Sequence, residues 1–464
     1  MGPRRRRLLG SLGSLVQVGS PGDETRALLV VDDALATRIL DLAVRIGETM
    51  LVTGASASEV TLTIVRVAGS YGLDPVHVDV TYNSITAAHH HSGAARPITL
   101  MRVVRGSVPD HDKLQRIQAL VAEVGAGMEL GEAVERYREI RRRPFRYRPL
   151  VVISAQALLA VGVAVMYGGT WLVILLAFLG AGGAALTQFG LGRARVPYFF
   201  SQIAGAFVLT MVAAASPLLA ATGWEPAQGL RPSLIVASGI VLMLAGLTVV
   251  GAAQDAIDGF ALTATGRILE LMTHTLGVVL GILAGLETAR VLGVGMDPPD
   301  DALPFGPIPL QLLGAVLIAI SVAVFNGAGG RIVAVSATLS LVAWVGYLAT
   351  TAVGFDVAAA SGAGALLGSF VGIVLAHRLH VPSVAITIAA ILPMVPGAAV
   401  FRGLLSVVAA DGSPAVLLDG FGTLVSAAII GISLAVGASL GIYLGQPVRS
   451  TLGSVVRTRA RVRR

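Results

Sequence analysis

The sequence has no cysteine and one lysine among 464 residues, and only 13% of its residues are charged. The lack of cysteine excludes disulfide scaffolds, thiolate metal sites and cysteine nucleophiles. A P-loop needs a glycine-rich loop before a lysine that reaches nucleotide phosphates, and Lys113 follows no such loop. Soluble domains carry about 25% charged residues, so the low charge indicates a membrane protein without a P-loop ATPase motor. The mean hydropathy of +0.79 also indicates a membrane protein.

Apolar runs dominate the chain from about residue 149 to about residue 445. A helix needs roughly 20 residues to cross a hydrocarbon core of ~30 Å. Ten runs approach or exceed this length, and we predict membrane spans at 150–167, 170–190, 198–221, 231–252, 268–293, 307–325, 332–353, 357–376, 381–408 and 421–444.

Arginine clusters at both ends of the apolar region predict the orientation. Five arginines precede the first span within 141–148, and six follow the last span within 449–464. The opposite connections contain Arg231 and Arg290 together with three aspartates at 297–301. Cytoplasmic loops carry an excess of Lys and Arg, and an even number of spans places both ends on one side. Both termini are therefore predicted to be cytoplasmic.

The chain outside the spans divides into two tails and a small domain. Residues 1–30 are predicted to be a basic disordered tail, and residues 446–464 a basic cytoplasmic tail. The four arginines at 4–7 also resemble a signal-peptide n-region, but export of the following domain conflicts with the arginines before the first span. Residues 31–148 alternate between helical and strand periodicity, which predicts a cytoplasmic α+β domain.

Within this domain, Ser56 and Glu59 have the spacing of a capping box that opens a helix. Strands are predicted from Val76, at 84–90 and at 97–105, and further helices from about Asp110 and Gly131. Alternation in the first strand gives one polar face, formed by His77, Asp79, Thr81 and Asn83. These residues are candidates for acid–base chemistry, but no nucleophile elbow or phosphate loop accompanies them.

Three adjacent histidines at 89–91 end the second predicted strand. Neighbouring residues of a strand point to opposite faces, so these side chains converge poorly on one ion. We predict a solvated strand end and no metal site. The sequence also gives no signal for a cofactor or for a nucleic-acid partner.

The membrane region contains a weak internal repeat. The fourth span begins with Pro232 and contains Gly246, and the ninth begins with Pro382 and contains Gly397, so proline and glycine are separated by 14 and 15 residues. An odd number of spans in each repeat forces opposite orientations, which is the plan of many secondary transporters. We predict two inverted five-helix repeats, at 149–300 and 301–445.

Two prolines and a glycine interrupt the ninth span, at Pro393, Pro396 and Gly397. Each proline removes a backbone donor and obstructs the preceding turn. Free carbonyls at membrane depth are tolerated only against protein or a water-filled cavity. The interruption is therefore a candidate substrate site, with Gly246 as its counterpart in the fourth span; a packing kink is the alternative.

Polar residues around one cytoplasmic connection are the other candidates. Ionisable residues within or beside spans are rare and mark pathways. Substrate binding is assigned to Gln254 and Asp255, and proton coupling to Asp255, Asp258, Glu270 and His274. The alternative is that the aspartates mark the interface and pair with Arg267. Arg402 could attract a substrate carboxylate or could snorkel to the interface.

Several segments in combination resemble the threonine/serine exporter family, as found in actinobacteria. They are 54–60, 71–73 and 77–86 in the N-terminal domain, 235–255 in the fourth span, and 393–403 in the ninth. The resemblance covers about residues 35–445. It implies a cytoplasmic N-terminal domain, ten membrane helices, and export of L-threonine and L-serine driven by the proton motive force. Relatives often have Pro-Gly where this chain has Ala245 and Gly246, so a milder break is expected there.

Together these observations predict an α-helical polytopic protein of the bacterial plasma membrane. Its partners would be L-threonine, L-serine, protons and the lipid bilayer, with a homo-oligomer as one possible assembly. Two other functions stay open: a membrane-anchored hydrolase with the N-terminal domain as catalytic unit, and an uncoupled channel.

Overall fold

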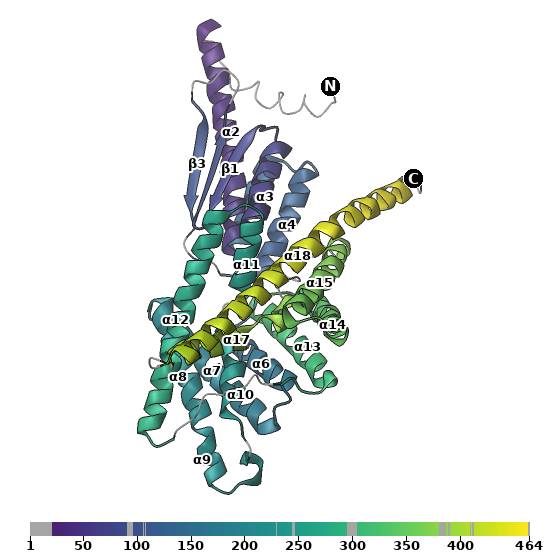
Figure 1. The fold of residues 1–464 in the computed structure, drawn as a ribbon. Helices are drawn as coiled ribbons and strands as arrows, with labels where there is room; N and C mark the ends of the chain where they lie inside the picture. Colours follow the sequence, from purple (N-terminus) through teal and green to yellow (C-terminus); the bar gives the residue numbers. More distant parts are fainter. Residues whose placement is uncertain are drawn as a thin grey trace.

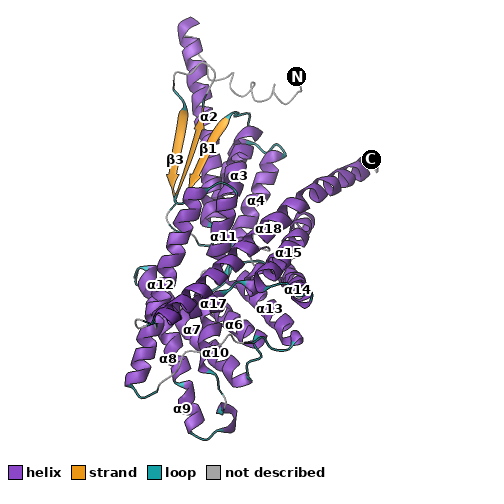
Figure 2. Ribbon diagram, viewed as in Figure 1, coloured by secondary structure: helices purple, strands orange, loops and turns teal. Residues whose placement is uncertain are grey.

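The computed structural model describes residues 21–90, 96–104, 106, 108–228, 230–243, 246–294, 304–379, 387, 390–408, 410 and 413–462. An N-terminal head with a small sheet stands at one end of a helical bundle (Figure 1). All strands of the described residues lie in the head (Figure 2).

The head contains four helices and three strands: α2 (Pro21–Val52), α3 (Ala57–Ser70), β1 (Val76–Thr81), β2 (Ser84–His89), β3 (Ile98–Val103), α4 (His111–Gly125) and α5 (Leu130–Arg142). The strands form an antiparallel sheet in the order β1-β2-β3, with Val76 opposite His89 and Ser84 opposite Val103. The predicted strands and helices are confirmed to within a few residues.

The head has its own apolar core. Leu40 of α2, Ile64 of α3, Ile85 of β2 and Ile117 of α4 are fully buried in one cluster. Burying each such side chain stabilises the fold by roughly 1.5–3 kcal/mol. The predicted N-cap is also present, since the Ser56 hydroxyl accepts the Glu59 backbone N–H at 3.2 Å.

The described parts of both predicted tails are helical, which differs from the disorder predicted for the N-terminal one. Helix α2 begins at Pro21, so residues 21–30 are helical. At the other end, α18 (Pro414–Val462) continues without a break through most of the predicted C-terminal tail. Residues 1–20 of the predicted N-terminal tail lie outside the described residues.

Among the described residues, eight helices are long and apolar enough to cross a membrane. They are α6 (Pro149–Met166), α7 (Trp171–Arg193), α8 (Tyr198–Ala214) continued by α9 (Ser216–Ala221), α12 (Ala261–Val291), α13 (Ile308–Phe325), α14 (Gly330–Ala352), α15 (Val357–Leu379) and α18. These eight correspond to the predicted spans other than the fourth and the ninth. A short 3-10 turn, η1 (Glu225–Ala227), follows α9.

The fourth predicted span is described as helix on both sides of residues 244 and 245, which lie outside the described residues: α10 (Pro232–Met243) before them and α11 (Gly246–Ile257) after them. The described part of the ninth ends in a 3-10 turn, η2 (Leu392–Met394), and helix α17 (Gly397–Val408). Its expected start at Pro382 lies outside the described residues, as does Ala245.

Close helix pairs organise the bundle. Helix α6 packs on α7 and α13, α8 packs on α7 and α12, and α15 packs on α14 and α18. The helices of the fourth predicted span lie among these pairs, since α10 contacts α6, α7, α8 and α17, while α11 contacts α12 and α18.

Glycine rows allow two of these pairs to approach closely. The rows are Gly277, Gly281 and Gly285 on α12, and Gly437, Gly441 and Gly445 on α18. A Cβ on Gly277 would lie 3.0 Å from the Phe199 carbonyl oxygen of α8, and one on Gly441 would press on the Leu366 carbonyl of α15. Small residues at such spacing let membrane helices pack backbone to backbone.

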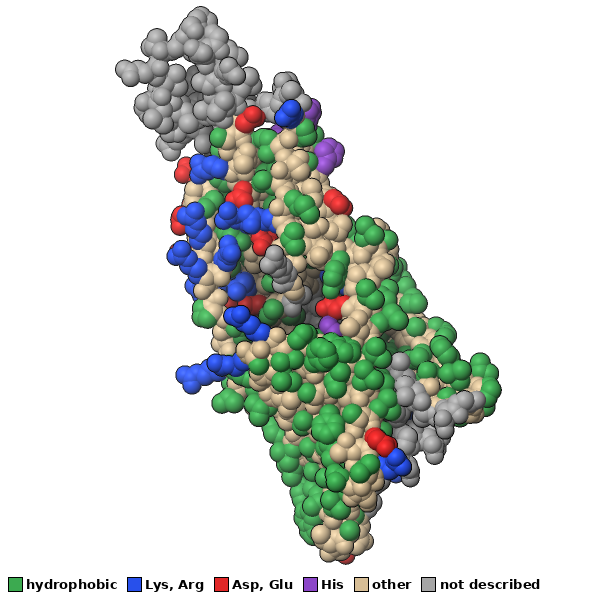
Figure 3. Space-filling view, turned by 90° about the vertical axis from the view of Figure 1, so that its left-hand side faces the viewer, with side chains coloured by type: hydrophobic (Ala, Val, Ile, Leu, Met, Phe, Trp, Pro, Cys, Tyr) green, Lys and Arg blue, Asp and Glu red, His purple; other side chains and the backbone are tan. Residues whose placement is uncertain are grey.

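The surface of the molecule changes character along its length. In Figure 3, most charged side chains gather over the head, and hydrophobic side chains cover most of the bundle. Exposed apolar residues on α12 and α18 contribute to the bundle surface; they include Leu269, Met272, Leu276, Ile429, Ile432 and Val436. Such a surface suits a lipid environment.

Candidate functional site

A buried ion pair joins the fourth predicted span to the fifth. Asp255 on α11 is fully buried, and its Oδ2 lies 3.1 Å from Nη1 of Arg267 on α12. Arg267 can approach because Gly251 has no side chain; a Cβ there would lie 2.6 Å from the same nitrogen. Neither carboxylate oxygen has a side-chain hydrogen bond among the described residues. Burying a charge is costly unless it is paired, so Arg267 is required to keep Asp255 inside.

The head also approaches the Asp255–Arg267 pair. The Ala57 backbone amide, at the N-terminus of α3, interacts with the Asp255 carboxylate. A helix N-terminus carries a partial positive charge, so it adds to the attraction from Arg267. Asp255 is thus held between a head helix and a bundle helix.

The tip of the β1-β2 hairpin packs on the beginning of α12. The Tyr82 hydroxyl donates a hydrogen bond of 2.8 Å to Oε2 of Glu270, and the Thr263 hydroxyl donates to the Val80 carbonyl at 3.3 Å. The Tyr82 ring covers Gly266, where a Cβ would lie 2.5 Å from the ring. Burial, together with the bond to Glu270, raises the pKa of Tyr82 to about 12, so its hydroxyl keeps its proton at neutral pH.

The other predicted coupling residues are separated from one another. His274 is half-buried and meets the Tyr198 ring edge-on, with centroids 4.6 Å apart. Glu270 points to the head hairpin, and Asp258 is exposed beyond the end of α11. Asp255 pairs with Arg267, as the interface alternative expects, whereas Asp258 forms no ion pair among the described residues. Gln254 is half-buried on α11.

A glutamine cluster beside α10 is missing from the sequence-based candidates. Gln188 Nε2 donates to Gln202 Oε1 at 2.8 Å, and Gln202 Nε2 donates to the Tyr198 hydroxyl at 2.9 Å. Gln202 is buried and also reaches the Met243 carbonyl of α10, at 3.4 Å. The cluster therefore links α7 and α8 to α10. The sequence indicates this cluster only by two uncharged amide side chains inside apolar spans. A search limited to ionisable residues does not find them.

The helix of the ninth predicted span is interrupted at the expected residues. Val395 is extended between η2 and α17, and Pro396 and Gly397 lead into α17. The Gly397 N–H donates to the Val395 carbonyl at 2.8 Å. Pro393 and Pro396 are half-buried and Gly397 is buried, while Gly246 begins α11 in the fourth span. The ninth predicted span thus presents a helix N-terminus within the bundle, at Gly397.

Arg402 is half-buried on α17 and interacts electrostatically with Tyr167, which follows α6. Tyr167 stacks on Phe305, with centroids 5.1 Å apart, and Phe305 meets Trp344 edge-on at 5.5 Å. Arg402, which lies on α17 after the interruption, is therefore close to an aromatic cluster formed by other segments.

The polar strand face of the head does not form a site. His77, Asp79 and Asn83 are exposed, and Thr81 is half-buried with its hydroxyl 2.5 Å from that of Ser84. Of the adjacent histidines, His89 is buried with Nδ1 2.8 Å from the Pro75 carbonyl, His90 is exposed, and His91 lies outside the described residues. The described residues contain no group of three His, Cys, Asp or Glu side chains that could hold a metal ion.

Comparisons with known proteins identify the family. A family described as "Putative threonine/serine exporter" matches residues 41–289, and one described as "Threonine/Serine exporter, ThrE" matches residues 311–443. No solved structure matches the chain. A probable threonine/serine exporter of Mycobacterium tuberculosis is 31% identical over 444 residues, which is 94% of this chain and 81% of that protein. A threonine/serine exporter of Corynebacterium glutamicum is 31% identical over 426 residues, 90% of this chain and 85% of its own length. The chain therefore belongs to the threonine/serine exporter family and is a multi-pass membrane protein.

Proposed function

We propose that this chain is a secondary transporter that exports L-threonine and L-serine from the cytoplasm, driven by inward proton movement. Both relatives described above are named as exporters of these amino acids. The family consists of exporters, so the hydrolase interpretation of the exposed strand face is set aside. The observation that carries the proposal is that α10 of the fourth predicted span contacts α17, which follows the interruption of the ninth.

The packing of the bundle supports two inverted five-span repeats. If each span is matched with the one five places later, the contacts between helices correspond. The contact of α6 with α7 corresponds to that of α13 with α14, and the contact of α7 with α8 to that of α14 with α15. The contact of α8 with α12 corresponds to that of α15 with α18, and the contact of α11 with α18 to that of α17 with α12. The glycine rows fall on α12 and α18, which are the fifth and tenth spans of this scheme. The boundary between the two family matches, from 289 to 311, coincides with the boundary between the repeats.

The substrate would bind where α10 of the fourth predicted span meets the interruption of the ninth. An amino acid carries a carboxylate and an ammonium group, and helix N-termini bind carboxylates. Gly397 begins α17, and Arg402 on the same helix adds a positive charge. Gly246, the counterpart of Gly397 in the fourth span, would line the same site. Pro393 and Pro396 would maintain the interruption.

Proton coupling would run through Asp255. In this scheme its buried pair with Arg267 breaks when a proton or the substrate ammonium takes the place of the guanidinium. Gln254 would contact the substrate beside it. Glu270, His274 and Asp258 would relay protons between this pair and the cytoplasm. Both termini and the head would be cytoplasmic, as the arginine distribution predicts.

The experiment is efflux of preloaded L-threonine from cells that express the chain, with and without a protonophore. Asp255→Asn is compared with Asp419→Asn, because Asp419 is exposed on α18. We expect protonophore-sensitive efflux that is lost in Asp255→Asn and kept in Asp419→Asn. Efflux that continues after collapse of the gradient would indicate an uncoupled channel. Absence of both threonine and serine efflux would contradict the proposal.

A further inference from the structure

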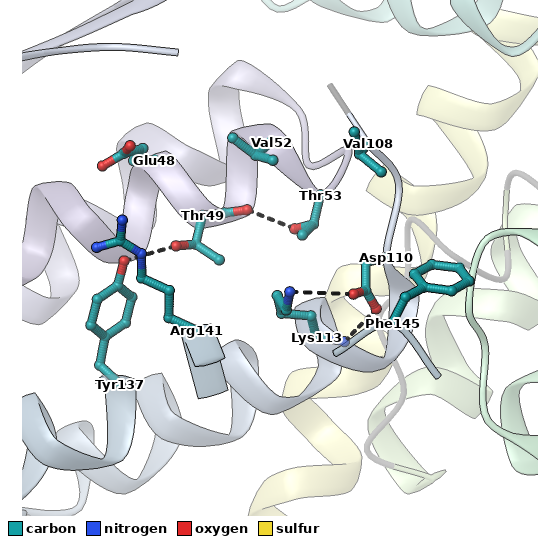
Figure 4. Close-up of a pocket in the computed structure, with 10 residues that line it drawn as sticks. All are labelled: Glu48, Thr49, Val52, Thr53, Val108, Asp110, Lys113, Tyr137, Arg141 and Phe145. Carbon is teal, nitrogen blue, oxygen red and sulfur yellow. Dashed lines mark hydrogen bonds and ion pairs between the residues drawn. The ribbon is translucent and has the colours of Figure 1, made fainter. Parts of the chain in front are cut away.

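A pocket of about 300 Å³ lies in the head, between α2, α4, α5 and the segment that leads to α6 (Figure 4). Its volume is at the lower end of the ~300–1,000 Å³ range of small-molecule sites. The pocket is formed by residues other than those of the exposed polar strand face and of the fourth and ninth predicted spans. It is therefore separate from the proposed transport path.

The charged residues of the pocket balance one another. Two cations, Lys113 and Arg141, and two carboxylates, Glu48 and Asp110, line it. A ligand with charge of one sign would be attracted by one pair and repelled by the other. A zwitterion can satisfy both signs at once.

One end of the pocket suits a carboxylate. Figure 4 shows the Arg141 guanidinium beside the Tyr137 hydroxyl, which lies 2.9 Å from the Thr49 hydroxyl. Glu48 is already paired with Arg102, at 3.3 Å, whereas Arg141 forms no ion pair within the described part of the chain. The Tyr137 hydroxyl donates to the Arg45 carbonyl at 3.1 Å, so the Arg141 guanidinium supplies the donors at this end. A guanidinium binds a carboxylate through two parallel charge-assisted hydrogen bonds.

The other end suits an ammonium group. Asp110 is buried and caps α4, with Oδ1 accepting the Lys113 backbone N–H at 3.0 Å. Its Oδ2 is 3.5 Å from Lys113 Nζ, which is longer than a charge-assisted hydrogen bond of about 2.7–2.9 Å. This oxygen can therefore accept a second donor.

Apolar side chains complete the pocket and limit its occupant. Val52, Val108 and Phe145 line it between the charged groups. They offer contact to a short aliphatic group, and the small volume excludes a long side chain. The combination fits an α-amino acid with a small side chain.

The pocket is connected to the bundle. The Phe145 ring and the Asp110 carboxylate lie against Gly327, where a Cβ would be 2.9 Å from the ring. The His111 N–H, next to Asp110, donates to the Asn326 carbonyl at 2.8 Å, and the Tyr147 hydroxyl donates to the Ala328 carbonyl at 2.7 Å. A ligand in the pocket would thus alter the contacts that the head makes with the connection between α13 and α14.

We propose that this head pocket binds a small zwitterionic α-amino acid and so regulates the transporter from the cytoplasm. Binding itself does not depend on the proposed export function; only its regulatory meaning rests on that function.

The test is isothermal titration calorimetry of the full chain in lipid nanodiscs with L-threonine, L-serine, succinate and inorganic phosphate. The Asp255→Asn chain is used so that the proposed transport path is impaired. Arg141→Gln is compared with Arg142→Gln, its neighbour on α5 that does not line the pocket. Both arginines are exposed, so both variants should fold. We expect threonine or serine to bind, at least tenfold more weakly in Arg141→Gln and unchanged in Arg142→Gln.

Binding of phosphate or succinate in place of the amino acids would overturn the assignment of a zwitterion, and equal affinity in both arginine variants would overturn the site. Efflux from cells separates this proposal from the export function. If wild type exports threonine and Arg141→Gln binds it normally, only the pocket proposal fails. If wild type exports nothing but Arg141 is required for binding, only the export function fails.

Discussion

The Tyr82 hydroxyl of the head donates a hydrogen bond of 2.8 Å to the carboxylate of Glu270, which lies 188 residues later in α12. Tyr82 is at the turn between two strands, and Glu270 is one turn beyond Gly266, on which the tyrosine ring rests. This contact places the hairpin beside the buried Asp255–Arg267 pair. The head is therefore docked directly on the connection between the fourth and fifth predicted spans.

Tyr82→Phe should loosen this docking without unfolding the head. The loss of one hydrogen bond to a carboxylate at a partly exposed site is expected to cost about 1 kcal/mol. Hydrogen exchange of the 76–89 hairpin in the full chain measures the effect. A double-mutant cycle with Glu270→Gln is the control; if the two single changes simply add, the bond contributes nothing to docking.

Arg267→Gln should destabilise the bundle strongly, because it leaves Asp255 buried without its cation. Removal of one partner from a buried pair costs about 3–5 kcal/mol. Asp255→Asn together with Arg267→Gln should recover much of this loss, since no unpaired charge remains. Thermal unfolding in detergent checks the order of the three proteins. A double variant less stable than Arg267→Gln alone would contradict this account of the pair.

The glycine rows predict that alanine will not be tolerated where helices touch. Gly281→Ala on α12 and Gly441→Ala on α18 should each cost about 1–3 kcal/mol by overpacking against a neighbouring backbone. Gly422→Ala is the matched control on α18, because a Cβ there meets nothing within 4 Å. Unfolding midpoints of the three variants provide the measurement. A Gly422→Ala change as harmful as Gly441→Ala would show that backbone contact is not the cause.

Gln202→Leu should impair export more than stability would explain. The change removes the Gln202 contact to the Met243 carbonyl, a buried group whose loss of a partner costs about 1–3 kcal/mol, and it also removes the partner of the half-buried Gln188 amide. Helix α10 should then shift, and the KM for exported threonine should rise. Gln228→Leu is a suitable comparison, because Gln228 is an exposed glutamine next to η1. An unchanged KM in a folded Gln202→Leu protein would separate this cluster from the substrate path.

Acid should weaken the junction between the head and the bundle through His111. Burial lowers the pKa of His111 from 6.5 to about 4. The folded protein therefore disfavours the proton that the unfolded chain accepts, so the stability that this residue provides is complete above pH 6.5 and is lost as the pH falls towards 4. The loss is expected to reach about 3 kcal/mol. Unfolding midpoints from pH 7 to pH 4 should fall less steeply in His111→Gln than in wild type, with exposed His77→Gln as the control.

Local signals predict the head elements well. Apolar and polar residues alternate over 76–81, as in a strand with one buried and one exposed face, and the observed burial follows this pattern. The Ser56 cap likewise depends only on residues within one helical turn. In the bundle, Pro393 and Pro396 predict the interruption because proline acts on its own backbone. These features are all decided within a few residues of chain.

The missing features depend on contacts between distant segments. Nothing near Tyr82 predicts Glu270 as its partner, because the two meet only when the head lies against α12. Gln202 is uncharged and lies in an apolar span, and only helix α10 beside it explains its burial. The two glycine rows could have been found by their four-residue spacing, but the helices that they face could not.

The length of α18 links the fourth and ninth predicted spans mechanically. Its 49 residues form one helix, which at 1.5 Å per residue is a rod of about 74 Å. This rod touches α11 of the fourth predicted span and α17 of the ninth. A stiff helix in contact with both α11 and α17 cannot tilt towards one of them without moving away from the other. Movements at the two segments should therefore alternate, even though no residue of one segment need sense the other directly.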